Sequence, residues 1–106
     1  MNLIDKLGIA NEESEIEEIS AYIADDVRNE IYSLEQIKEI LIIFNKFDLF
    51  TLKYKTREQI LYTISEIANT YQIKGMCDLN KVFEIRDLLE DDLKEYIDEI
   101  LNMCKN

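Results

Sequence analysis

Residues 14–31 read SEIEEISAYIADDVRNEI and place an apolar side chain at every third or fourth position. That spacing forms one apolar stripe along a helix. Ser14 and Glu17 fit a capping box, in which the two side chains bind backbone amides that the first turn leaves free. The stretch therefore predicts a helix over residues 15–30. Its inward side chains are expected to be Ile16, Ile19, Ile23, Val27 and Ile31.

The same signals recur along the rest of the chain. Further capping boxes begin at Ser33 and Thr56, and Asp78 precedes the last apolar-periodic stretch. On one continuous helix Leu88 would fall on the acidic side, so we favour a break near residue 90. The helices predicted after the first span residues 34–47, 57–72, 79–90 and 92–104. The second of the five helices is expected to turn inward Leu34, Ile37, Ile40, Leu41, Phe44 and Phe47.

The composition agrees with an all-α fold. The 106 residues include no proline and only two glycines, so few residues interrupt a helix. Apolar and polar side chains alternate over residues 48–55, but a lone strand would have no partner, so we predict an extended loop there. The length is typical of one domain. We expect a single domain over residues 1–106, a compact bundle of four to five helices with short connections.

The missing residue types limit the chemistry. The chain has no histidine, which excludes Ser-His-Asp and Cys-His nucleophile systems and histidine-ligated metals. Two glycines cannot build a phosphate-binding loop. The segment that begins at Asp78 starts like a calcium-binding loop, but Val82 and Phe83 occupy the positions where that loop needs an oxygen ligand and a glycine. We therefore expect no enzyme activity, no catalytic residue, no cofactor and no metal site.

The charge limits the partners. The chain carries 23 acidic and 12 basic side chains, a formal net charge of -11, which disfavours nucleic acid and anionic membranes. The longest apolar run, residues 40–44, is far shorter than a bilayer span, and the start has no signal-peptide pattern. Cys77 and Cys104 are more simply interpreted as small, buried, reduced side chains than as a disulfide. We expect a cytoplasmic protein of undetermined oligomeric state.

The acidic surplus is concentrated in two segments. Residues 12–30 contain eight acidic side chains and one basic one, and residues 84–99 contain eight and two. Like charges four residues apart on a helix repel each other, so stability alone would favour alternating signs. A plain solvated face remains an equal alternative, because acidic residues favour a first helical turn and improve solubility.

Tyr22 favours a binding role for the first segment. It lies outside the apolar stripe, where its ring could anchor a basic partner that the carboxylates attract. Tyr62 is likewise expected to be exposed, whereas Tyr96 is expected in the core. The first candidate partner-binding surface comprises Glu18, Tyr22, Asp25, Asp26 and Glu30. The second candidate surface comprises Asp87, Asp91, Glu95 and Glu99.

Three functions fit these features. In size, helix content and charge the chain resembles nuclease-toxin immunity proteins, which implies an immunity- or antitoxin-type inhibitor that occludes a basic protein such as a nuclease toxin. The Asp-x-x-Tyr-x-Pro motif of colicin DNase immunity proteins cannot occur without proline, so no family is assigned. The alternative is a helical adaptor or phage-type interaction module with an apolar groove at Phe50, Leu52, Tyr54 and Leu88. The third is a sensor that holds a small anionic ligand at Lys53, Tyr54, Lys55 and Arg57.

Overall fold

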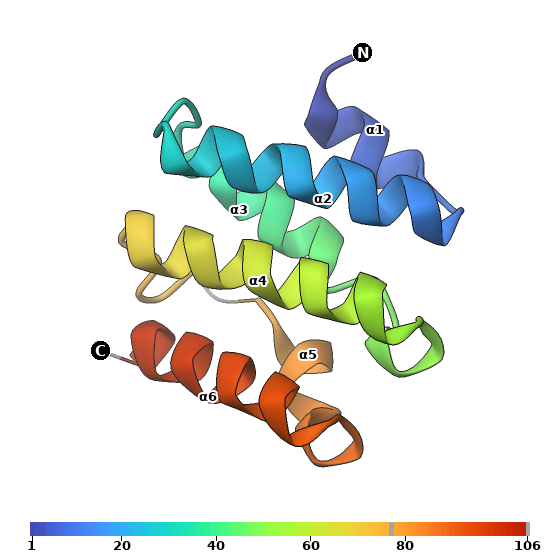
Figure 1. Cartoon of the computed structure of the whole chain (residues 1–106). Helices are drawn as coiled ribbons and strands as arrows, with labels where there is room; N and C mark the ends of the chain where they lie inside the picture. Colours follow the sequence, from blue (N-terminus) through green and yellow to red (C-terminus); the bar gives the residue numbers. More distant parts are fainter. Residues whose placement is uncertain (77, 106) are drawn as a thin grey trace.

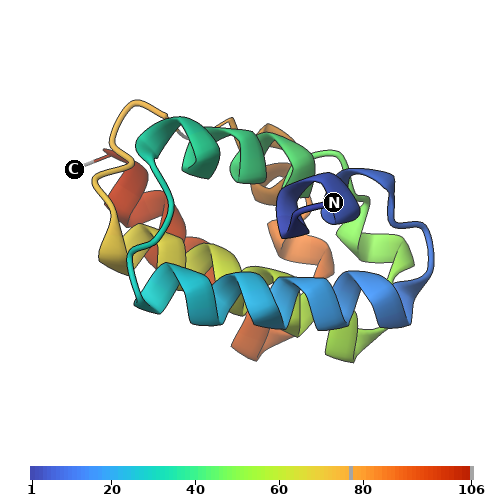
Figure 2. The same cartoon turned by 90° about the horizontal axis from the view of Figure 1, so that it is seen from above.

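Six α-helices form two layers in a computed structural model that describes residues 1–76 and 78–105. The helices are α1 (Leu3–Ile9), α2 (Glu13–Arg28), α3 (Leu34–Phe44), α4 (Tyr54–Thr70), α5 (Asn80–Glu84) and α6 (Asp91–Lys105). Helices α2, α4 and α6 lie side by side, with α1, α3 and α5 behind them (Figures 1 and 2). No strand occurs in the described ranges, so the predicted all-α bundle is confirmed.

The three long helices of the front layer run parallel (Figure 1). Glu13 at the start of α2 accepts a hydrogen bond from the backbone amide of Lys53, which immediately precedes α4. Tyr54 at the start of α4 in turn donates one to Asp92 at the start of α6. The N-terminal ends of three helices therefore share one edge, where their dipoles favour negative charge. This arrangement accounts for part of the acidic surplus without any partner.

The core lies between the two layers and follows the predicted stripes. Its largest contributions from α2, α3, α4 and α6 are Ile16, Ile19, Ile23, Val27, Ile37, Ile40, Leu41, Phe44, Ile60, Leu61, Ile64, Ile67, Leu93, Ile97 and Ile100. The core prediction is wrong for two residues: Ile31 and Leu34 are 61% and 50% exposed. Helix α2 ends at Arg28, so Ile31 lies in the connection beyond its stripe. Tyr96 and Phe47 are half-buried, and both pack against the core.

Only one of the three predicted capping boxes forms. Ser33 accepts a hydrogen bond from the amide of Gln36, whose side chain accepts one from the Ser33 amide. Ser14 lies inside α2, which begins one residue earlier at Glu13. Thr56 is buried inside α4, which begins at Tyr54 without a side-chain cap. The amide of Lys53, immediately before the helix, donates instead to Glu13 of α2, a contact that local sequence could not reveal.

The connections also differ from the prediction. Residues 48–55 are not an extended loop: Asp48 caps a 3-10 helix, η1 (Leu49–Thr51), and α4 has begun by Tyr54. The predicted helix over 79–90 is replaced by α5 and a second 3-10 helix, η2 (Arg86–Leu88), while the break before α6 is confirmed. Asp78 does not cap α5, which begins at Asn80. Helix α3 ends at Phe44 rather than at residue 47.

Helix α1 is absent from the sequence prediction. The side chain of Asn2 accepts a hydrogen bond of 2.9 Å from the amide of Asp5, and Ile4 and Leu7 are buried against the core. Only these two residues of the seven-residue helix are buried, which is too short a pattern to reveal a stripe. The helix covers the edge of α2 and α3 and forms one wall of the site described below.

Cys104 is half-buried and takes part in a disulfide, which corrects the expectation of a buried, reduced thiol there. The expectation for Cys77 falls outside the described residues. Within the described ranges, no helix combines the length and the apolar character needed to cross a bilayer.

Candidate functional site

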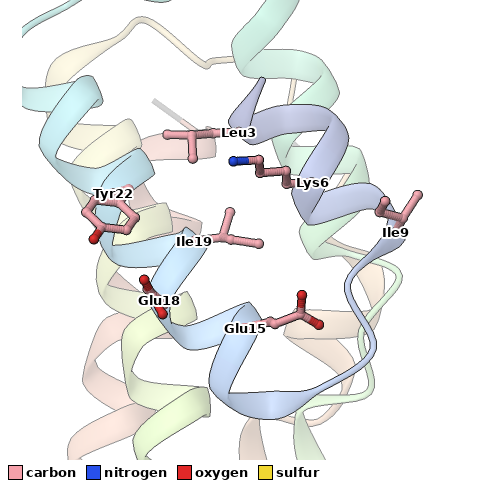
Figure 3. A pocket seen from close by; sticks show the side chains of 7 residues that line it. All are labelled: Leu3, Lys6, Ile9, Glu15, Glu18, Ile19 and Tyr22. Carbon is pink, nitrogen blue, oxygen red and sulfur yellow. The ribbon is translucent and has the colours of Figure 1, made fainter. Parts of the chain in front are cut away.

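A hollow between α1 and α2 contains the centre of the first candidate surface (Figure 3). This first hollow has a volume of about 360 Å³ and is lined by Leu3, Lys6, Ile9, Glu15, Glu18, Ile19 and Tyr22. Leu3 and Lys6 extend from α1 toward α2, and Ile19 lies between the helices (Figure 3). The structure thus brings Tyr22 and Glu18 together, as predicted, and adds an apolar wall from α1.

Tyr22 is 53% exposed, although the side chain immediately after it, Ile23, is fully buried. The α2 stripe turns Ile23 inward and leaves Tyr22 at the rim. Among the described residues, Tyr22, Glu15 and Glu18 have no hydrogen-bond or ion-pair partner within the protein. One ring and two carboxylates therefore remain available to another molecule.

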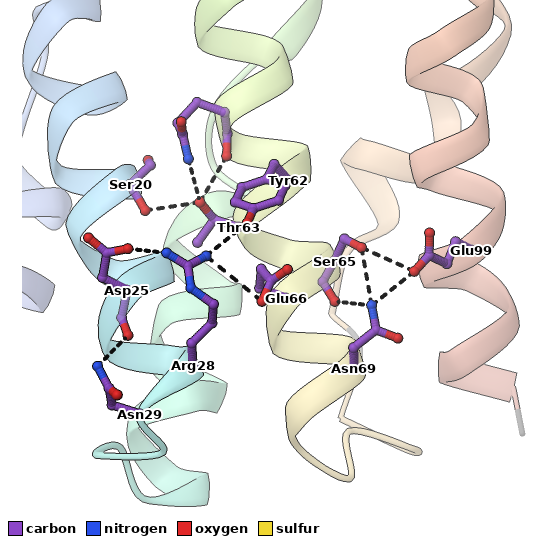
Figure 4. A network of polar contacts seen from close by, with 11 residues as sticks. Ser20, Asp25, Arg28, Asn29, Tyr62, Thr63, Ser65, Glu66, Asn69 and Glu99 are labelled. Carbon is purple, nitrogen blue, oxygen red and sulfur yellow. Dashed lines mark hydrogen bonds and ion pairs between the residues drawn. The ribbon is translucent and has the colours of Figure 1, made fainter.

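Asp25 already has a partner inside the protein. Arg28 hydrogen-bonds Asp25, donates to the hydroxyl of Tyr62 at 2.8 Å and lies 3.9 Å from Glu66 (Figure 4). Its guanidinium carbon also lies 6.0 Å from the centre of the Tyr62 ring. Tyr62 is consequently half-buried beneath Arg28 rather than exposed. The Asp25 charge is partly neutralised, which weakens its case as a partner contact.

Asp26 lies on the other side of α2 from Asp25 and lines a second hollow, beside Ile31 and Tyr32. The Tyr32 hydroxyl donates a hydrogen bond of 3.0 Å to Asp26, and the Tyr32 amide donates one of 3.2 Å to the hydroxyl of Tyr71. Burial, together with this bond and the adjacent carboxylate, raises the pKa of Tyr32. Asp26 thus helps to hold the connection between α2 and α3, and the Tyr32 hydroxyl occupies one acceptor position of its carboxylate.

Glu30 has left-handed backbone geometry, with φ of 55°. Its amide binds the carbonyl of Val27 at 2.9 Å, and the amide of Ile31 binds that of Asp26 at 3.4 Å. These two bonds form a Schellman motif that ends α2, with Glu30 at the position usually occupied by glycine. Its side chain is exposed, and no described residue forms a hydrogen bond or ion pair with it.

The second candidate surface is less uniform than predicted. Asp87 lies in η2, outside the helix that carries the other three carboxylates, and pairs with Arg86 at 2.9 Å. Asp91 lies 3.4 Å from Lys94. Glu99 accepts hydrogen bonds from the side chains of Ser65 and Asn69, at 3.2 and 2.9 Å (Figure 4).

Glu95 is the remaining carboxylate of the second candidate surface. It lines a third hollow of about 310 Å³ between α4 and α6, with Glu58, Asp92, Tyr96 and Glu99. Burial and the surrounding carboxylates raise the pKa of Tyr96. Because three of the four predicted carboxylates have partners, Glu95 alone carries an unengaged charge on this surface among the described residues.

Two of the four residues proposed for an anionic ligand, Tyr54 and Arg57, have structural roles, whereas Lys53 and Lys55 are exposed. Arg57 donates to the carbonyls of Leu49 and Phe50, at 2.8 and 2.7 Å, and to Glu90 at 2.9 Å. The Tyr54 hydroxyl hydrogen-bonds Asp92, which raises the pKa of Tyr54. The guanidinium that a phosphate would need is therefore occupied by the protein itself.

The proposed apolar groove keeps some exposed members. Phe50 and Leu88 are 51% and 61% exposed, while Leu52 is half-buried and Tyr54 has the carboxylate partner just described. Phe50 also packs against Arg57, whose guanidinium carbon lies 6.0 Å from the ring centre.

Sequence reasoning missed the α1 side of the first hollow. Leu3, Lys6 and Ile9 were not candidates because α1 itself was not predicted. The one local signal was Asn2, an N-cap residue three positions before Asp5, whose amide it binds. An N-cap followed by Ile4 and Leu7 at helical spacing would have indicated the helix.

In the part of the chain that the structure describes, no three acidic or cysteine side chains are grouped closely enough to hold a metal ion. No family model, curated protein or solved structure matches this chain.

Proposed function

We propose that this protein is a small acidic helical binding protein of the immunity or antitoxin type, without catalytic activity, that occludes a basic protein such as a nuclease toxin. Carboxylates on the exposed side of α2 would bind the cationic groups with which the partner holds its own substrate. Tyr22 would add an apolar anchor at the centre. Inhibition would then be steric and electrostatic.

One observation carries this proposal: Tyr22 is more than half exposed beside Glu15 and Glu18, and none of the three has a partner among the described residues. Tyrosine is favoured in interfaces because it supplies a large, rigid contact area with a polar tip. The second surface offers fewer unengaged carboxylates, so α2 is the better candidate.

The structure revises the residues of the proposed surface. Glu15 and Glu18 replace Asp25 as the main electrostatic contacts, because Asp25 is paired with Arg28. Asp26 would keep its charge but offer fewer acceptor positions to a partner, since Tyr32 donates a hydrogen bond to it. Glu30 stays on the surface as an unengaged carboxylate at the end of α2.

A cytoplasmic location remains a prediction. The disulfide of Cys104 disfavours a cytoplasmic location, because the reducing cytosol keeps most cysteines as thiols. Fractionation of source cells with an antibody to the chain would decide the compartment.

The proposal is tested by parallel capture from source-cell extract with three baits: the wild-type chain, the variant Tyr22→Ala/Glu18→Lys, and the variant Glu39→Lys. Glu39 is exposed on α3, so the last variant makes the same charge change on another helix. A true partner should be retained by the wild type and by Glu39→Lys but lost with the double variant. It should also have a basic isoelectric point.

The purified partner is then titrated at two salt concentrations, and its catalytic activity is assayed with and without the chain. Affinity should fall at least about tenfold between roughly 50 and 500 mM salt, because steering by exposed charges is screened. Inhibition of the partner should parallel binding. If the affinity of the partner does not change with salt or with Tyr22→Ala/Glu18→Lys, this surface is not the binding site, and the adaptor alternative is favoured.

A further inference from the structure

A second hollow adjoins the first. It lies beside Asp26, also has a volume of about 360 Å³ and shares Leu3 and Lys6 with the first. Because they share these two side chains, the two hollows are neighbours along α1, and we name the pair the α1 groove. Tyr22 lines one of them and Ile31 lines the other.

The α1 groove gathers unusually exposed apolar side chains. Ile9, Ile31 and Tyr22 are 69%, 61% and 53% exposed, and all three line it. Scattered apolar side chains on a surface need no explanation, but a contiguous group rimmed by charges is typical of an interaction site. The groove thus offers apolar contact as well as charge.

The charges on its rim indicate the occupant. Its lining contains the carboxylates of Glu15, Glu18 and Asp26 against a single basic side chain, that of Lys6, which lies in the last turn of α1 where it complements the helix dipole. A second copy of the chain would bring another net charge of -11 to this surface. Complementarity therefore favours a basic occupant over self-association.

We propose that the α1 groove receives a basic amphipathic helix of the partner, an inference that rests on the function proposed above. Apolar side chains at helical spacing on one face of that helix would enter the two hollows, one beside Tyr22 and one beside Ile31. Lysine or arginine side chains flanking the first of them would pair with Glu15 and Glu18. This spacing of anchors is how amphipathic helices bind grooves in general.

Two synthetic peptides test the inference. The first is an amphipathic helix of about 15 residues with leucine at helical spacing and lysine elsewhere, and the second carries serine in place of each leucine. Each is titrated into the isotopically labelled wild-type chain while backbone amide resonances are followed. The titrations are repeated with Ile9→Ser/Tyr22→Ser, with Glu18→Lys, and with Leu88→Ser as a control for an exposed apolar residue outside the groove.

The leucine peptide should bind at least about tenfold more tightly than the serine peptide, since burying even one side chain contributes that much. It should shift resonances of Leu3, Lys6 and Tyr22. Ile9→Ser/Tyr22→Ser should abolish the difference between the peptides, and Leu88→Ser should preserve it.

Equal affinities for the two peptides, both weakened by Glu18→Lys, would overturn the groove inference but leave the proposed acidic binding surface intact. Binding that ignores Glu18→Lys, or shifts confined to the third hollow between α4 and α6, would overturn both. Sedimentation that shows a wild-type dimer broken by Ile9→Ser/Tyr22→Ser would also overturn the inference, because the occupant would then be a second copy.

Discussion

The hydroxyl of Thr63 on α4 lies 2.9 Å from the backbone carbonyl oxygen of Ser20 on α2 and 2.8 Å from that of Gln59 on its own helix, so its one proton is shared between these two acceptors (Figure 4). Thr63 and Ser20 are both fully buried. Short side chains at this point let the two helices approach closely, and the contact fixes α2, which carries the proposed binding surface, against the centre of the front layer.

Replacing Thr63 with valine should lower the free energy of unfolding by about 1–2 kcal/mol, because the shape is kept while a buried hydrogen bond is lost. Urea denaturation followed by circular dichroism measures the change. Thr70→Val, at the end of the same helix, is the control and should stay within about 0.5 kcal/mol of wild type. Equal losses in both variants would show that the hydrogen bond is not the cause.

For Ser20, at the same interface, we expect the opposite effect on stability. Its hydroxyl oxygen is buried and has no hydrogen-bond partner among the described residues. Ser20→Ala removes this polar atom and improves helix propensity, so stability should be unchanged or rise by up to about 1 kcal/mol. A loss larger than about 1 kcal/mol in the same urea assay would mean that the hydroxyl is bonded after all.

Glu30 should be replaceable by glycine with a gain in stability. Its left-handed backbone costs a non-glycine residue about 1 kcal/mol, so Glu30→Gly should raise the free energy of unfolding by about that amount. Glu30→Ala keeps a Cβ atom and should give no such gain. If both variants stabilise the protein equally, repulsion by the carboxylate, and not backbone strain, is the cause.

Sequence periodicity predicted the interior of this fold better than its ends. The stripes through Ile23 and Ile64 are set by helical spacing alone, and both residues are fully buried. The starts of α2 and α4 were placed wrongly because the capping signals at Ser14 and Thr56 are not used, and the amide before α4 binds instead Glu13, a contact between helices distant in sequence.

In the candidate site, too, some features could be predicted from helical spacing and others could not. Exposure of Tyr22 followed from its position on the α2 wheel. The pair of Asp25 with Arg28 lies three residues apart on α2, a spacing at which helical side chains meet, so the sequence could have indicated it. The bond from Tyr32 to Asp26, by contrast, depends on how the chain folds after the end of α2, which periodicity cannot supply.

Arg57 should be essential for the packing of η1 against α4 and α6. Its side chain is only 15% exposed and binds two backbone carbonyls and Glu90. Arg57→Lys keeps the charge but cannot reach three acceptors at once, so we expect a loss of about 1–3 kcal/mol in urea denaturation. Lys55→Met, on the exposed side of the same helix turn, should change stability by less than about 0.5 kcal/mol.

Arg86 and Asp98 join η2 to α6 through two parallel hydrogen bonds, from Nε to Oδ1 at 2.6 Å and from Nη2 to Oδ2 at 2.7 Å. The hydrogen bonds from Arg86 hold the pKa of Asp98 below its ordinary value of 3.8. A carboxyl whose pKa is lowered by folding stabilises the protein above its unfolded pKa, and this contribution is lost as the pH falls through the lower, folded pKa.

The coupling between Arg86 and Asp98 should therefore be constant from about pH 7 to pH 5 and should shrink below about pH 4. It is measured by a double-mutant cycle with Arg86→Gln, Asp98→Asn and the double variant, from urea midpoints at each pH. Because the side chains of Arg86 and Asp98 are 37% and 53% exposed, the coupling should also decrease when salt screens the pair. A coupling that persists unchanged to about pH 2 would mean that packing of the two side chains, rather than the ionised pair, connects η2 to α6.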